Sequence, residues 1–151
     1  MPLYHLAPIT LAAGSEIQPG NFGRMIRRYR PDIGNNAWLL SRELIFEAVR
    51  EQAAPSAPSR LSACFALEDL AAAHRYQAHN DGNFLMVMHE VELVDATAAQ
   101  HRGALPLIDF PPPCHPFLDT VRMRARDYWS GGGSGDREIV TTSALRVVQA
   151  I

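Results

Sequence analysis

The stretch from residue 128 to the end, YWSGGGSGDREIVTTSALRVVQAI, constrains the fold more than any other part of the chain. Two aromatic residues precede a glycine-rich loop, and a backbone this free is a poor helix or strand former. The β-branched residues after the loop predict a strand over 139–142 and a second short strand over 145–148. Glu138 then lies where the first of these strands begins, so its carboxylate can face a ligand. On this stretch alone, an exposed structural glutamate is the simpler interpretation.

The rest of the chain alternates between short strands and helices. Residues 3–6 form an apolar stretch closed by Pro8, residues 61–67 read LSACFAL, and residues 84–94 are apolar on both alternating faces; each predicts a strand. Helices are expected from Asn35 or Asn36 to Gln52, over 68–79 and over 117–128. We therefore expect an α+β fold in a single domain spanning residues 1–151.

The longest predicted helix has two expected faces. Helical spacing places four apolar residues toward the core: Ala37, Leu40, Leu44 and Ala48. Glu43 and Glu47 are expected on the exposed face, paired with arginines. The Pro/Ser stretch at 53–59 predicts a linker that ends the helix. Residues 96–116 predict a loop, because the prolines at 111–113 forbid regular structure there.

Composition excludes several classes of protein. A net charge of −2 argues against a protein that mainly coats nucleic acid or anionic membrane. All 14 basic residues are arginine, so lysine chemistry is excluded. The two cysteines do not form a CxxC pair and fit a reducing compartment. Because no signal peptide or long apolar run is evident, we expect a cytoplasmic protein that is not in a membrane.

The sequence also lacks the patterns of several kinds of active site. The histidines and cysteines have no metal-ligand spacing, and the chain contains neither a GxSxG motif nor a phosphate-binding P-loop. An arrangement of aromatic and carboxylate groups remains. Phe65 and Tyr76 are eleven residues apart, one on a strand and one on the following helix, so both rings could converge on one side. Two core aromatics would explain this pair equally well.

Three stretches taken together resemble the ADP-ribosyltransferase superfamily: LYH near the start, ACFALEDLAAAHRY in the middle and DREIVTTSALRVV at the end. In its His-Tyr-Glu branch, which includes diphtheria toxin and the poly(ADP-ribose) polymerases, a first strand carries the histidine. A second strand and its helix carry two tyrosines at the same separation, and a late strand opens with the catalytic glutamate. The short rifampin ADP-ribosyltransferases are similar in size. The resemblance implies a split, mostly antiparallel β-sheet core with flanking helices.

The resemblance also implies a role for each matching residue. His5 would hold the adenosine ribose of NAD, the co-substrate, and Phe65 and Tyr76 would sandwich the nicotinamide ring. Glu138 would bind the 2′-hydroxyl of the nicotinamide ribose. A fixed carboxylate beside that sugar stabilises the positive charge that develops as the glycosidic bond breaks.

Further residues follow from the same resemblance. Asp136, two residues before Glu138, matches the position that handles the acceptor in the Arg-Ser-Glu toxin branch. Tyr128 and Trp129, just before the glycine loop, would contact the acceptor as well. Three residues near the N-terminus are assigned to NAD binding: Tyr4, Gly20 and Asn21.

The chain departs from the family pattern at two places. Phe65 stands where the family has its first tyrosine, and Leu6-Ala7 stands where it has Gly-Thr. These departures favour an alternative, a non-catalytic module that binds NAD or another nucleotide. A third interpretation, nucleic-acid binding, rests on the arginines over 24–30 and 122–126. The acceptor of an active enzyme stays open between a protein, a nucleic acid and a small molecule.

Overall fold

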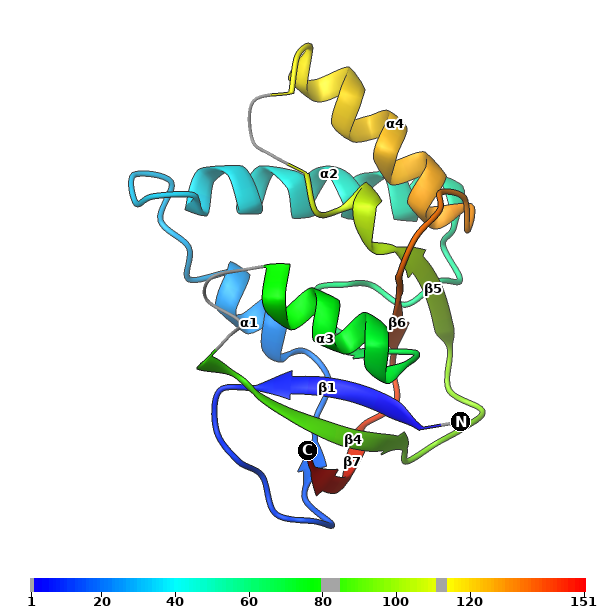
Figure 1. The fold of residues 1–151 in the computed structure, drawn as a ribbon. Coiled ribbons are helices and arrows are strands. Elements are labelled where there is room, and N and C mark those ends of the chain that lie inside the picture. Colours follow the sequence, from blue (N-terminus) through cyan, green and yellow to red (C-terminus); the bar gives the residue numbers. More distant parts are fainter. Residues whose placement is uncertain (1, 80–84, 111–113) are drawn as a thin grey trace.

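Seven strands form one antiparallel sheet in the computed structural model, which describes residues 2–79, 85–110 and 114–151 (Figure 1). The order across the sheet is β2-β7-β4-β1-β3-β6-β5. The strands are β1 (Leu3–Ala7), β2 (Glu16–Ile17), β3 (Cys64–Leu67), β4 (Val87–Leu93), β5 (Gln100–Ala104), β6 (Arg137–Thr141) and β7 (Leu145–Ala150). With the helices below, this arrangement confirms the predicted α+β class.

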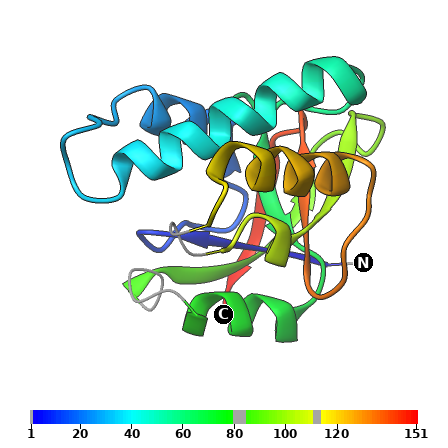
Figure 2. The same ribbon diagram turned by 90° about the horizontal axis from the view of Figure 1, so that it is seen from above.

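The helices divide into two groups over the sheet. They are α1 (Asn21–Ile26), α2 (Asn36–Ala53), α3 (Leu70–His79) and α4 (Phe117–Trp129), with a 3-10 turn, η2 (Leu105–Leu107), before α4. The α3 helix packs on β1 and β3, whereas α2 and α4 pack against each other beside β5, well apart from α3 (Figures 1 and 2). Within the described ranges, none of these helices has the length and apolar character required to cross a bilayer.

The predicted core face of α2 is wrong over its second half, whereas Ala37 and Leu40 in the first half are partly buried. Leu44 is 54% exposed and Ala48 is also exposed, whereas Phe46 and Val49 are buried against α4. Glu43, expected on the surface, is only 1% exposed. The sequence pattern does not reveal the buried face of α2, because one residue of that face is charged. A glutamate rarely lies in a core unless it is paired.

The predicted loop over 96–116 is also wrong in its first half, because β5 pairs with β6 there. The sequence QHRGA contains no β-branched or large apolar residue, so nothing local indicates a strand. Gly103 has a tertiary role: a Cβ at this position would overlap the ring of Tyr128, which packs against the strand. Phe84 and the prolines at 111–113, on which two of the predictions above relied, lie outside the described residues.

The strands that carry the matching motifs lie next to one another. β1 and β3 are paired at a single register position, Tyr4 opposite Leu67, whereas β1 and β4 are paired at five. On the other side of β3, Leu67 is opposite Glu138 and Phe65 is opposite Val140. Alternation along these strands places both of these β3–β6 pairs on one face of the sheet, the face that the helices cover. Glu138 therefore projects between α3 and the α2–α4 pair.

Candidate functional site

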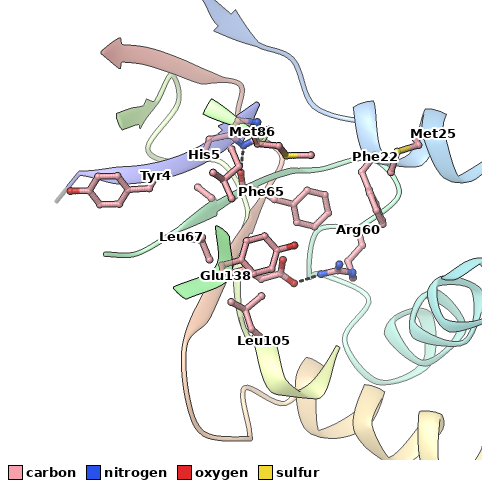
Figure 3. Close-up of a pocket in the computed structure, with 13 residues that line it drawn as sticks. Tyr4, His5, Phe22, Met25, Arg60, Phe65, Leu67, Met86, Leu105 and Glu138 are labelled. Carbon is pink, nitrogen blue, oxygen red and sulfur yellow. Dashed lines mark hydrogen bonds and ion pairs between the residues drawn. The ribbon is translucent and has the colours of Figure 1, made fainter. Parts of the chain in front are cut away.

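Three neighbouring strands and two helices enclose a cavity of about 310 Å³, called the strand cavity below (Figure 3). β1 contributes His5, β3 contributes Phe65, β6 contributes Glu138 and α3 contributes Tyr76. The four residues that the resemblance assigns to cofactor and chemistry thus line one space, although up to 133 positions separate them, from His5 to Glu138. The remaining lining residues are Tyr4, Leu6, Phe22, Met25, Arg60, Ala66, Leu67, Met86 and Leu105.

His5 lies where β1 and β3 stop pairing. Its Nδ1–H donates to the carbonyl oxygen of Phe65 at 2.8 Å. The imidazole therefore takes the place of a backbone hydrogen bond between β1 and β3. Burial lowers the pKa of His5, and this effect outweighs the opposing hydrogen bond to the carbonyl. The ring is therefore neutral at pH 7, with Nδ1 as the donor and Nε2 as an acceptor for a hydroxyl group.

The aromatic residues of the strand cavity come from different elements. Phe65 is held edge-on by Phe22 of α1, with ring centroids 5.3 Å apart. Tyr76 is brought close by the small residues Ala72 and Ala73, both buried where α3 meets the sheet. Burial and, secondarily, the Glu138 carboxylate raise the pKa of Tyr76, so its phenol stays protonated at neutral pH.

Glu138 is 7% exposed and accepts hydrogen bonds from two buried groups. The Tyr128 hydroxyl donates to Oε1 at 2.8 Å, and the Arg60 guanidinium donates to the same oxygen (Figure 3 shows the Arg60 contact). Arg60 Nη1 also donates to the Tyr128 hydroxyl at 2.9 Å. The carboxylate is therefore held in one orientation at the wall of the cavity, and both of these hydrogen bonds end on Oε1.

Arg60 joins Glu138 to a second buried carboxylate. Its Nε donates to Oε2 of Glu43 at 3.0 Å, and Arg42 donates to Oε1 of Glu43 at 2.7 Å. Burial opposes the charge on Arg60, but the carboxylates of Glu138 and Glu43 outweigh it and raise the pKa. Burial likewise opposes the charge on Glu43, but Arg60 and Arg42 lower its pKa below the ordinary value. Two cations and two anions alternate in this chain of contacts, which we call the Arg60 network.

Two residues predicted to contact an acceptor lie inside the protein instead. Trp129 is 5% exposed and donates its Nε1–H to the carbonyl oxygen of Phe46 at 2.8 Å. Tyr128 is fully buried and reaches the site only through its hydroxyl, on the inner side of Glu138. Aromatic residues next to a glycine loop had indicated a surface, but α4 ends against α2, which places both rings in the core.

The remaining predicted residues lie at the edges of the site. Asp136 is held by two hydrogen bonds from Arg75, at 2.8 and 2.7 Å, and borders a hollow of about 330 Å³ that shares Tyr76 with the strand cavity. Gly20 and Asn21 start α1 but do not line the strand cavity within the described residues. Tyr4 lines it, although its ring is buried against α3 and points away from the His5 side (Figure 3).

Sequence reasoning missed Arg60, Glu43 and Phe22. Arg60 lies between the Pro/Ser linker at 53–59 and the strand predicted over 61–67 and was assigned to neither, although a single arginine directly before a buried strand is a usable signal. Glu43 and Phe22 carried no such signal, because a glutamate on a predicted helix is usually exposed and a phenylalanine between turn residues is usually a core residue.

Residues 15–151 match the family described as "Protein of unknown function (DUF2441)". The curated proteins include no match to the chain.

Proposed function

The chain belongs to the DUF2441 family, and from the site that it builds we propose that it is an NAD-dependent ADP-ribosyltransferase of the His-Tyr-Glu type. One observation carries the proposal: His5, Phe65 and Glu138, on three adjacent strands, line a single cavity together with Tyr76. The single pairing between β1 and β3 supports the split sheet that this superfamily would require.

The strand cavity suits the nicotinamide riboside half of NAD. Its volume of about 310 Å³ is at the lower end for ligand pockets, too small for a whole dinucleotide. Phe65 and Tyr76 both line the cavity and would contact a planar amide-bearing ring. The neutral imidazole of His5 offers an acceptor for a ribose hydroxyl, toward the β1 end of the cavity.

Glu138 would act on the ribose. Its carboxylate accepts a hydrogen bond from the sugar 2′-hydroxyl and stabilises the positive charge that grows on the ring. The carbon–nitrogen bond to nicotinamide breaks, and its electron pair neutralises the pyridinium nitrogen. The acceptor oxygen or nitrogen then bonds to the same carbon and releases its proton to solvent.

Nicotinamide release from NAD tests the proposal. The purified protein should bind NAD in a calorimetric titration and release nicotinamide slowly, with water as the acceptor. Binding without any release, including in the presence of cell extract as a source of acceptors, would favour the second candidate below. Failure to bind NAD at all would overturn the transferase and restrict the second candidate to another nucleotide.

The second candidate is a non-catalytic module that binds NAD or another nucleotide in the same cavity. The Arg60 contact favours it, because Glu138 already has a buried cation as its partner. Phe65 in place of a tyrosine also favours it, since ring stacking is kept while a hydroxyl is lost.

Replacing His5 with alanine should weaken NAD binding about tenfold, because one buried hydrogen bond to the ribose is lost. Calorimetric titration measures the change. His74→Ala removes an exposed imidazole from α3 and serves as the control, with unchanged affinity expected. Equal affinities of His5→Ala and the unaltered protein would remove His5 from the binding site.

Replacing Asp136 with alanine should reduce transfer to an acceptor more than it reduces NAD hydrolysis, because Asp136 borders the hollow next to the cavity rather than the cavity itself. Both rates can be followed by nicotinamide release, with and without acceptor. Arg75→Ala is the matched variant, since it removes the partner of Asp136 and keeps the carboxylate. Equal loss of transfer and hydrolysis in Asp136→Ala would contradict an acceptor role.

A further inference from the structure

A cavity larger than the two spaces described above, of about 650 Å³, lies on the α2 side of Glu138 and shares Tyr76, His79, Leu105 and Asp109 with the hollow that Asp136 borders. It shares Phe22, Arg60, Tyr76, Leu105 and Glu138 with the strand cavity, so one carboxylate borders both spaces. Among the described residues, those of β1 line the strand cavity but not this larger space. The two spaces therefore meet at Glu138 and extend away from it in different directions. We call the second one the aromatic chamber.

Aromatic side chains form much of this chamber, and the protein core holds them in place. Trp38 meets the rings of Phe110 and Phe117 edge-on, with centroids 5.0 and 5.4 Å away. Phe110 is itself buried in the cluster between α2 and α4. Tyr29 and Leu39 complete the outer side of the wall and are half-buried. A wall supported in this way is formed before any ligand arrives, which lowers the entropic cost of binding.

Among the described residues that line the chamber, both arginines are paired with carboxylates. Arg42 donates to Glu43 and, through Nη1, to the carbonyl oxygen of Ile108 at 3.1 Å. Arg60 is committed to Glu43 and Glu138. The remaining pair, Asp109 with His79 at 3.2 Å, adds a carboxylate. Phosphates need unpaired arginines or backbone donors, so a nucleic acid is poorly matched to this space.

We infer that the aromatic chamber binds the acceptor, and that the acceptor is a small aromatic molecule, uncharged or cationic, with a hydroxyl or amino group as nucleophile. This inference rests on the proposed transferase function, because it uses Glu138 as the point where acceptor and ribose meet. The volume suits a molecule of about two to four fused or linked rings. Transfer forms a bond from the nucleophile to the ribose carbon, expels nicotinamide with the electron pair of the old bond, and gives the nucleophile's proton to solvent.

Three naphthalene probes that share the same ring system and carry substituents of different charge test the chamber. β-Naphthol is uncharged, β-naphthylmethylamine is cationic and β-naphthyl phosphate is anionic. We expect the first two to bind in calorimetric titrations, both alone and with saturating NAD, and the phosphate to bind at least about tenfold more weakly. Equal or tighter binding of the phosphate, competition between β-naphthol and NAD, or failure of all three probes to bind would overturn the inference.

Two variants locate the binding in the chamber. Tyr29→Ala removes part of the outer wall and should weaken β-naphthol binding about tenfold, whereas Leu39→Trp fills the space and should abolish it. Met123→Ala, at an exposed position of α4, is the control and should bind as the unaltered protein does. Thermal melting establishes that each variant is folded. Unchanged binding in both chamber variants would overturn the inference.

Nicotinamide release separates this inference from the function on which it rests. Release of nicotinamide without binding of any probe would overturn the inference about the aromatic chamber, whereas the proposed transferase activity would still hold. Probe binding without nicotinamide release from NAD would support a ligand site in the chamber and count against the transferase, and with it against the acceptor role.

Discussion

Replacing Glu138 with glutamine is expected to lower nicotinamide release about 10²- to 10³-fold while NAD affinity stays within about threefold. Glutamine keeps the shape of the side chain, and its carbonyl oxygen can still accept from Tyr128 and Arg60. It loses the negative charge that stabilises the ribose cation. Since that cation exists only near the transition state, the loss should fall on turnover and not on binding.

Two further variants make this result interpretable. Glu92→Gln changes an exposed strand glutamate in the same way and should release nicotinamide at the full rate. Tyr128→Phe keeps the charge of Glu138 and removes one hydrogen bond that orients it, so a loss of roughly tenfold is expected. Thermal melting of each variant controls for unfolding. A folded Glu138→Gln protein with full activity would contradict the catalytic assignment.

The sheet and its helices could be predicted largely from local patterns. β-branched residues indicated β6 and β7, and the small residues of α3 indicated a helix packed closely on the sheet. His5, Phe65 and Glu138 were each expected on a strand, and in the structure these three strands are neighbours. Each of these signals is carried by a residue and its neighbours along the chain.

The features that sequence reasoning missed depend on partners distant in the chain. Glu43 is buried because Arg60, 17 residues away, neutralises it. β5 forms because β6 offers an edge, and Gly103 leaves room for the Tyr128 ring. Trp129 is buried because α2 covers the end of α4. Neither propensity nor periodicity contains this information, since the same residues in another fold would lie on the surface.

The Arg60 network has a structural cost and a functional consequence. Removing charges from water is unfavourable, so a buried network of this kind is weak evidence for stability in itself. Removing one member of the network is strongly destabilising, because the charges of its partners then stay buried without an opposite charge beside them. The network also fixes Glu138, so the same contacts that allow its burial also set its orientation in the cavity.

Replacing Arg60 with leucine should therefore lower the free energy of unfolding by about 3–5 kcal/mol at pH 7. The loss leaves Glu43 with Arg42 as its cation and Glu138 with the Tyr128 hydroxyl alone among the contacts described above. Urea unfolding followed by circular dichroism measures it. Arg30→Leu, which breaks an exposed pair with Asp32, is the matched control and should change stability by no more than about 0.5–1 kcal/mol.

The pH dependence of the loss distinguishes charge from packing. Because the pKa of Glu43 is lowered on folding, its contribution is present above the ordinary carboxyl value and disappears as pH falls through the folded pKa. Without Arg60 that lowering shrinks, so the stability gap between the two proteins should be widest near pH 7 and narrow below about pH 4. Arg60→Lys keeps the positive charge and loses the planar guanidinium with its several N–H donors. The stability difference between Arg60→Lys and the unaltered protein should therefore be smaller and follow the same pH dependence. A gap that stays constant over this range would mean that Arg60 stabilises the protein by packing against Phe65 and Tyr128 and not through its charge.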